Sequence, residues 1–219
     1  MAQVTALPEP TAAEQATAKQ TITNQTSNVQ NQPSRRFPRQ GEWTYEDWLE
    51  LPADGWKYEI INGVLYMSPP PLIRHQDISG ELSSRMRIHA RAHKLGKVLA
   101  APCGVRLPEQ SVPIEPDILF VKRERLYIIE ERYVEGAPDL IVEILSPSTA
   151  TYDLETKFKL YQRAGVAEYW VVNSWERTVT IYRLIDGIYQ SVGVYGMGDT
   201  ATSSVFNEFQ ITVEDIFNL

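Results

Sequence analysis

The sequence contains a single cysteine, Cys103, and this scarcity excludes two common ways of stabilising a protein. One cysteine forms neither an internal disulfide nor a cysteine-based zinc cluster, so a packed hydrophobic core must supply the stability. The scarcity also fits a reducing compartment, and we expect a cytoplasmic protein. Cys103 itself falls in a predicted strand, where a small buried hydrophobic side chain is the ordinary interpretation.

Long apolar runs are also missing. No stretch approaches the roughly 20 apolar residues that a membrane-spanning helix requires, so no membrane association is expected. The first ten residues contain no lysine or arginine and no apolar segment follows them, which is unlike a secretory signal peptide. A transit peptide stays an alternative because the stretch is rich in threonine and poor in acids.

Positive charge is scarce as well. The chain has 21 lysines and arginines against 28 acidic residues, a formal net charge of −7. Residues 1–40 hold four of the basic and two of the acidic residues, which leaves 17 basic and 26 acidic residues, a net charge of −9, for the remainder. A charge of this sign disfavours non-specific binding to nucleic acid. Divalent cations bound to clustered carboxylates would offset part of it.

Residues 1–40 differ in composition from the rest of the chain. They are rich in glutamine, threonine, asparagine, alanine and proline, with few large apolar residues and no periodicity. Such a segment buries too little apolar surface to offset the entropy lost on ordering, so we expect a disordered low-complexity tail. Folded structure is expected from about Trp43, with residues 41–219 forming one domain.

The remaining sequence predicts a mixture of helices and strands. Thr44-Tyr-Glu-Asp47 has the spacing of a helix N-terminus, and Asn62-Gly63 between the apolar runs 57–61 and 64–67 predicts a hairpin. Further strands are expected at 98–100, 103–107, 117–121, 139–145, 168–173, 178–184 and 189–194. Together with the helices described next, this order predicts an α/β (α+β) fold with a central mixed β-sheet flanked by helices.

Three further helices are expected. The first covers residues 75–95 and is ended by Gly96, the second covers 153–164 and is ended by Gly165, and a short terminal helix is capped by Thr212. Three aromatic residues around the end of the second helix are expected to pack in the core: Tyr161, Tyr169 and Trp170.

Glu143 stands at the centre of the apolar run Pro138-Asp-Leu-Ile-Val-Glu-Ile-Leu145. Alternation in a strand places Asp139, Ile141, Glu143 and Leu145 on one face. A run this apolar predicts a strand buried on both faces, where an ionised carboxylate is costly unless a cation, a metal or hydrogen-bond donors receive it. A carboxylate that is costly in this way marks a candidate functional site.

Two other ionisable residues can be brought close to Glu143 by this layout. Asp117 opens the strand 117–121, and Lys157 lies in the helix that follows the Glu143 strand. Two acidic residues on adjacent strands can hold a hard cation such as Mg²⁺. A nearby lysine can orient a water or stabilise charge that develops on a phosphate. These are the groups needed for metal-assisted hydrolysis of a phosphodiester.

Several segments form one combined pattern: Tyr58 to Pro69, His75, Pro116-Asp117, Ala137 to Ser148, Asp153…Lys157…Tyr161, and Ala164 to Trp170. This pattern resembles the Uma family of predicted restriction endonucleases, which belongs to the PD-(D/E)XK nuclease superfamily. The resemblance covers the chain from about Trp43 to the C-terminus and leaves out the tail. Each segment alone is a weak indication, whereas the combination is specific.

The resemblance implies a restriction-endonuclease-like core over residues 41–219 and a DNA endonuclease that depends on Mg²⁺ or Mn²⁺. It assigns Asp117 to the first acidic position of the family and Glu143 to the acid of the (D/E)XK strand. Leu145 stands where the superfamily pattern has a lysine, and Lys157 matches a lysine that this family carries on the following helix. Glu59 matches an upstream glutamate and is expected to complete the metal shell.

Other functions remain open from the sequence. A catalytically silent interaction module that keeps the nuclease fold is favoured by the net charge of −9 outside the tail. Hydrolysis of RNA or of nucleotides is a further alternative. If the protein cuts both strands of DNA it needs two active sites, so a homodimer is expected by symmetry.

The candidate residues also have structural interpretations. Asp117 fits a turn cap, and Glu143 fits a buried ion pair with Lys157. Lys157 also fits an exposed helix residue that pairs with Asp153 four positions earlier. Asp139 fits a turn, although it shares a strand face with Glu143 and so could support the site.

The helix expected over residues 75–95 carries all three histidines. His75 matches a histidine of the family and is placed near the site or on an apolar helix face. His89 and His93 have the spacing of a zinc pair, but no third ligand is placed beside them. The opposite face carries three basic residues that either contact phosphates or are simply solvated: Arg87, Arg91 and Lys94.

Overall fold

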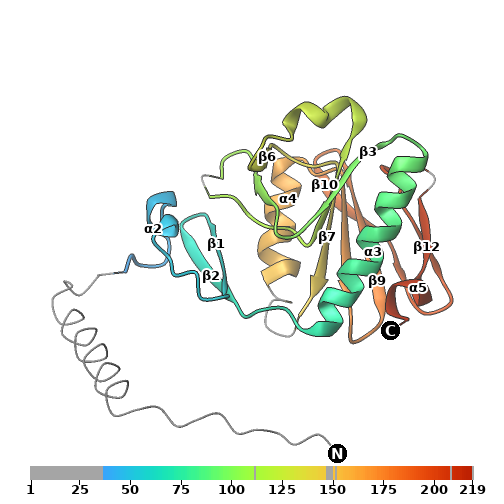
Figure 1. Cartoon of the computed structure of the whole chain (residues 1–219), viewed down its shortest axis with the longest axis horizontal. Coiled ribbons are helices and arrows are strands. Elements are labelled where there is room, and N and C mark those ends of the chain that lie inside the picture. Colours follow the sequence, from blue (N-terminus) through green and yellow to red (C-terminus); the bar gives the residue numbers. More distant parts are fainter. Residues whose placement is uncertain (1–36, 111, 147–149, 151, 208, 219) are drawn as a thin grey trace, which may run out of the picture. The chain divides into compact units, whose positions relative to one another are not determined.

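The computed structural model describes residues 37–219 except 111, 147–149, 151, 208 and 219. The chain divides into two units, Met1–Pro38 and Arg39–Leu219, and every described helix and strand lies in the second (Figure 1). The tail expected over residues 1–40 lies almost entirely outside the described residues, so it stays a prediction. Among the helices that are described, none is long and apolar enough to cross a membrane.

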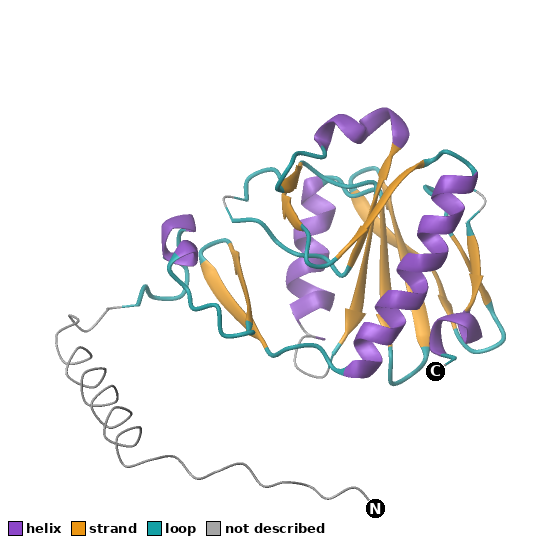
Figure 2. Ribbon diagram, viewed as in Figure 1, coloured by secondary structure: helices purple, strands orange, loops and turns teal. Residues whose placement is uncertain are grey.

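A six-stranded sheet forms the centre of the second unit, in the spatial order β10-β9-β8-β7-β5-β3. Its strands are β3 (Gly96–Ala100), β5 (Ile118–Lys122), β7 (Leu140–Leu145), β8 (Glu168–Asn173), β9 (Thr178–Ile185) and β10 (Ile188–Tyr195). β7 and β8 are parallel, and every other neighbouring pair is antiparallel. The predicted class, α/β with a central mixed sheet, is therefore confirmed (Figure 2).

Helices cover both faces of this sheet (Figure 2). On one face, α3 (Ile73–Ala92) packs its buried side chains against the even-numbered residues of β7, together with α5 (Val213–Phe217). On the other face, α4 (Phe158–Ala164) packs against the odd-numbered residues of β7. All six residues of β7 are buried, so the predicted strand buried on both faces is confirmed, and Glu143 points toward α4.

Three two-stranded sheets accompany the central one. They are β1 (Lys57–Ile61) with β2 (Val64–Ser68), β4 (Gly104–Arg106) with β6 (Tyr133–Glu135), and β11 (Thr200–Thr202) with β12 (Gln210–Thr212). The β1–β2 turn has φ of 51° at Asn62 and 73° at Gly63, as a tight hairpin turn requires. The predicted hairpin is confirmed, but it forms a sheet of its own.

Helix ends are the least accurate of the predictions. α2 (Tyr45–Leu49) begins as expected, because Thr44 and Asp47 form a capping box. α3 ends at Ala92, so Gly96 does not stop the helix but opens β3 with a φ of 151°. A β-carbon at Gly96 would collide with the carbonyl oxygen of Val121, which explains why glycine stands there. The helix predicted over 153–164 begins as a π-helical turn, η3 (Tyr152–Lys157), and α4 continues it.

Candidate active site

Lys157 lies at the junction of η3 and α4 and reaches down to β7. Its Nζ lies 2.9 Å from Glu143 Oε1, 3.3 Å from Asp153 Oδ1 and 3.5 Å from Glu59 Oε2. The lysine is 2% exposed, so the interpretation of Lys157 as a solvated helix residue is wrong. One ammonium group thus faces three buried carboxylates.

Glu143 is held by two donors on the same oxygen. Tyr161 OH donates a hydrogen bond of 2.5 Å to Glu143 Oε1, which also accepts the bond from Lys157. Tyr161 lies four residues after Lys157 on the same helix, so both donors approach from the α4 side of the sheet. Tyr161 is buried in the core, as expected, but its hydroxyl also fixes the orientation of the candidate metal ligand.

Asp117 lies on the strand edge next to Glu143. Ile118 pairs with Val142, so the antiparallel register places Asp117 opposite Glu143. Asp117 Oδ2 accepts a hydrogen bond of 2.7 Å from the Ile144 backbone N–H. His75 Nε2, from the first turn of α3, lies 3.1 Å from the same oxygen. Asp117 therefore bonds to a neighbouring strand and to α3, which a simple turn cap does not explain.

The carboxylates of Asp117 and Glu143 each accept hydrogen bonds on one oxygen only, as far as the described residues show. Among the described residues, no hydrogen bond reaches Asp117 Oδ1 or Glu143 Oε2, while the other oxygen of each is held. Fixed carboxylates with a free oxygen are the donors that Mg²⁺ prefers, and this ion is usually bound by one or two carboxylates plus water. In the described part of the chain, no three His, Cys, Asp or Glu side chains form a metal-ligand group. Asp117 and Glu143 have the donor chemistry that suits a hard cation, and they lie opposite each other on adjacent strands.

Glu59, on β1, contacts the site through an ion pair with Lys157. Glu59 Oε1 accepts a hydrogen bond of 3.0 Å from the Glu115 backbone N–H. Its other oxygen, Oε2, lies 3.4 Å from Tyr152 OH and 3.5 Å from Lys157 Nζ. Both oxygens of Glu59 have donors in this arrangement, so its role as a metal ligand stays a prediction.

The pKa values follow from burial and from the shared lysine. Burial raises the pKa of Glu143 to about 8, although the charge of Lys157 acts in the opposite direction. Burial also acts to raise the pKa of Glu59, but the charges of Lys157 and Lys57 outweigh it and leave the value below the ordinary one. Burial would lower the pKa of Lys157, yet Glu143 and the other carboxylates raise it well above its usual value. The buried carboxylates outnumber the lysines beside them, and Glu143 is the one whose pKa is raised.

Asp117 and His75 form a second pair. Burial acts to raise the pKa of Asp117, but the hydrogen bond to His75 and the charges of His75, Lys57 and Lys157 together outweigh burial and lower the pKa. Conversely, burial acts to lower the pKa of His75, but the hydrogen bond to Asp117 and the charges of Asp117 and Glu143 together raise it. The pKa of Asp117 is thus lowered and that of Glu143 is raised, so the ionised form is favoured more strongly at Asp117 than at Glu143.

These residues line a cleft of about 1540 Å³. Its walls come from α2, the β1–β2 hairpin, the triple proline 69–71, the start of α3 and the segment after β3. Asp117, Glu143, Lys157, Glu59 and His75 all contribute to its lining. The cleft therefore gives a substrate access to the candidate metal ligands.

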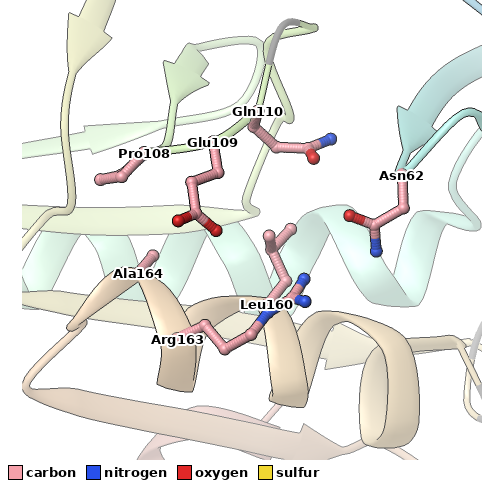
Figure 3. A pocket seen from close by; sticks show the side chains of 7 residues that line it. All are labelled: Asn62, Pro108, Glu109, Gln110, Leu160, Arg163 and Ala164. Carbon is pink, nitrogen blue, oxygen red and sulfur yellow. The ribbon is translucent and has the colours of Figure 1, made fainter.

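A second pocket is much smaller, about 60 Å³, and lies on another part of α4. Figure 3 shows its lining, which comes from α4 and from two loops: Asn62, Pro108, Glu109, Gln110, Leu160, Arg163 and Ala164. None of the predicted site residues belongs to it. A pocket of this size holds a few water molecules at most, so it is not the substrate site.

Other predicted candidates lie away from the site. Asp139 accepts hydrogen bonds of 2.9 Å from Arg125 and 2.8 Å from the Lys122 backbone N–H, and so fixes the loop before β7. The rings of His89 and His93 are tilted by 31° with centroids 4.4 Å apart, and no described third ligand joins them in a zinc site. Arg87 and Arg91 on α3, and Lys94 just after it, are exposed, and Arg87 lines the cleft.

The fold is that of a nuclease-like protein. The chain belongs to the Uma2 family, described as "Putative restriction endonuclease", which matches residues 45–214. The predicted family resemblance is therefore confirmed. None of the curated proteins matches the chain.

Among solved structures, the chain is similar to a "putative nuclease belonging to DUF820" from Anabaena variabilis ATCC 29413. The TM-score is 0.65 at 21% sequence identity, and the match covers 80% of this chain and 97% of that one. Likeness at this level of identity establishes the fold. The site must be argued from this chain's own residues.

Proposed function

We propose that this protein is a metal-dependent endonuclease that hydrolyses phosphodiester bonds in nucleic acid, with DNA as the expected substrate. One observation carries the proposal. Asp117 and Glu143 lie opposite each other on adjacent strands, each with one oxygen fixed and the other without a described hydrogen-bond partner. Membership of the Uma2 family supports the same reaction class.

In this proposal Asp117 and Glu143 hold Mg²⁺ or Mn²⁺. When bound, the metal supplies Lewis-acid polarisation of the phosphate and neutralises negative charge. The protein supplies the rest of the geometry: His75 and the Ile144 N–H orient Asp117, while Tyr161 and Lys157 orient Glu143. Fixing both ligands in advance lowers the cost of organising the site when substrate arrives.

In this proposal Lys157 takes the role of the lysine that the superfamily pattern has on the strand, where this chain has Leu145. Its ammonium lies beside Glu143, both residues line the cleft, and its raised pKa keeps it charged. A permanent positive charge at this place stabilises the negative charge that develops on a phosphate during hydrolysis. Asp153 and Glu59 hold the lysine in position, which gives both acids a role without direct contact to the metal.

A silent interaction module is the second candidate. It is favoured by the internal ion pairs that already neutralise part of the acidic cluster and by the net charge of −9 outside the tail. Titration calorimetry with Mn²⁺ separates the two functions. The nuclease proposal expects saturable binding that is lost in Asp117→Asn and kept in Asp139→Asn, which lies outside the site. Absence of saturable binding in the unaltered protein would favour the silent module.

The homodimer expected from symmetry stays a prediction. It depends on whether the protein cuts both strands of a duplex. Sedimentation velocity, at concentrations that span the micromolar range, would test it directly.

A further inference from the structure

The cleft offers few free cations to a polyanion. Four lysines and arginines line it, and two of these are already engaged. Lys157 is bound to three carboxylates, and Lys57 donates to the Glu115 carbonyl and lies 3.6 Å from Glu59 Oε1. The side chains of Arg87 and Arg132 are exposed and make no bond to any described residue. A protein that makes about 6–10 phosphate contacts to a duplex uses many more cations than the two free arginines of this cleft.

The cleft offers instead an exposed aromatic ring. Trp56 lines it and is 46% exposed, directly before β1. The loop that carries this ring is braced by one carboxylate: Asp54 Oδ1 accepts the Trp56 backbone N–H at 3.0 Å, and Asp54 Oδ2 accepts Tyr58 OH at 2.8 Å. A braced, solvent-exposed tryptophan is a platform on which an unpaired base can stack.

The burial of the two candidate metal ligands also favours an unpaired strand over a duplex. Glu143 is 2% exposed and Asp117 is 9% exposed, so a phosphodiester must enter the cleft to reach their free oxygens. A single strand can bend one phosphate inward while a neighbouring base stacks outside. A duplex carries its second strand and both phosphate rows to the same opening, where five acidic residues line the walls: Glu59, Glu115, Asp117, Glu143 and Asp153.

We infer that the cleft takes an unpaired nucleic-acid strand, of DNA or RNA, with one base stacked on Trp56 and phosphates beside Arg87 and Arg132. The inference rests on the proposed function for the reaction, but strand binding can be measured without cleavage. It also narrows the proposed function, because a single site suffices to cut an unpaired strand. The homodimer would then not be required for the chemistry.

Fluorescence anisotropy with Ca²⁺ in place of Mg²⁺ tests the inference. The probes are a labelled thymidine oligonucleotide, a uridine oligonucleotide of equal length, and a blunt DNA duplex of that length. We expect an unpaired probe to bind at least about tenfold more tightly than the duplex, and Trp56→Ala to lose about tenfold in affinity for it, the size of one base stack. Trp56→Phe should keep most of the affinity, because a ring remains. Comparison of the thymidine and uridine probes separates DNA from RNA.

Trp175→Ala is the matched control. Trp175 is 47% exposed, lies in the turn after β8, and does not line the cleft. Equal or tighter binding of the duplex, equal losses in Trp56→Ala and Trp175→Ala, or no binding of any probe would overturn the inference. The last result would point to a different class of partner, such as a protein.

Cleavage assays distinguish this inference from the proposed function. Duplex cleavage that requires Glu143 but is unchanged in Trp56→Ala would sustain the nuclease and contradict the strand inference. Binding of an unpaired strand that depends on Trp56, without cleavage of any probe in Mg²⁺ or Mn²⁺, would sustain the strand inference and contradict the nuclease.

Discussion

Lys157 Nζ lies 2.9 Å from Glu143 Oε1, although the two residues belong to a helix and to a strand fourteen positions earlier in the chain. Leu145 packs in the hydrophobic core at the position where the superfamily pattern has a lysine, so this strand position carries no charge. A positive charge is present beside the acid of β7, but it arrives from the helix that covers this face. Removing this charge should lower both the stability and the activity of the protein.

Lys157→Met is expected to lower the free energy of unfolding in EDTA by about 3 kcal/mol, because it leaves buried carboxylates without their cation. Urea unfolding followed by circular dichroism measures this loss. Lys159→Met is the control, since Lys159 lies exposed on the same helix. Equal stability of the two variants would show that Lys157 does not balance the acidic cluster.

The stability of the metal-free protein should depend on pH through Glu143. Burial raises the pKa of Glu143 to about 8 from its usual 4.5, so the folded protein holds a proton that the unfolded chain releases. The stabilisation from this proton is complete below pH 4.5 and is lost as the pH rises towards 8. In EDTA, the free energy of unfolding of the unaltered protein should therefore fall over this interval relative to Glu143→Gln. Parallel pH profiles of the two proteins would contradict the raised pKa.

Tyr161→Phe tests whether the hydroxyl that holds Glu143 acts as a positioning group. It should cost about 1 kcal/mol of stability, the usual contribution of one hydrogen bond, and it should lower kcat with little change in KM. Tyr189→Phe removes a comparable buried bond, from Tyr189 OH to the Val166 carbonyl at 2.9 Å, outside the site. It should show a similar loss of stability and an unchanged kcat. Equal kcat values for the two variants would mean that Tyr161 serves the core alone.

Much of the fold could be predicted because local physics decides it. The alternation around Glu143 predicted which residues face each side of β7, and Asn62-Gly63 predicted the hairpin with its turn. Three-residue strands such as β6 and β12 leave too short a pattern to be detected in the sequence. The π-helical turn η3 was not predicted for a different reason: over six residues its hydrogen-bond pattern leaves no distinct periodicity in the sequence.

The site could be predicted less completely than the fold. Glu143 was evident as a carboxylate in an apolar strand. For Asp117 and Lys157 the predicted layout showed only that they could lie close to Glu143, and the family resemblance assigned their positions. Their contacts depend on strand register and on the path of η3, which are set by tertiary packing. Tyr161 carried no polar indication in the sequence, because an aromatic residue on a helix face is usually core packing. Its hydroxyl has a role only because Glu143 lies opposite.

The most direct test of the account is the rate of cleavage of labelled oligonucleotides, unpaired and duplex, by the unaltered protein and by Glu143→Gln in Mg²⁺ or Mn²⁺. Asp139→Asn is the matched control, because Asp139 lies on the same face just before β7 but binds Arg125 instead of the cluster. We predict cleavage that requires the divalent ion, falls about 100-fold or more in Glu143→Gln, and persists in Asp139→Asn. Cleavage by Glu143→Gln at the unaltered rate would contradict the assignment of Glu143 to the active site.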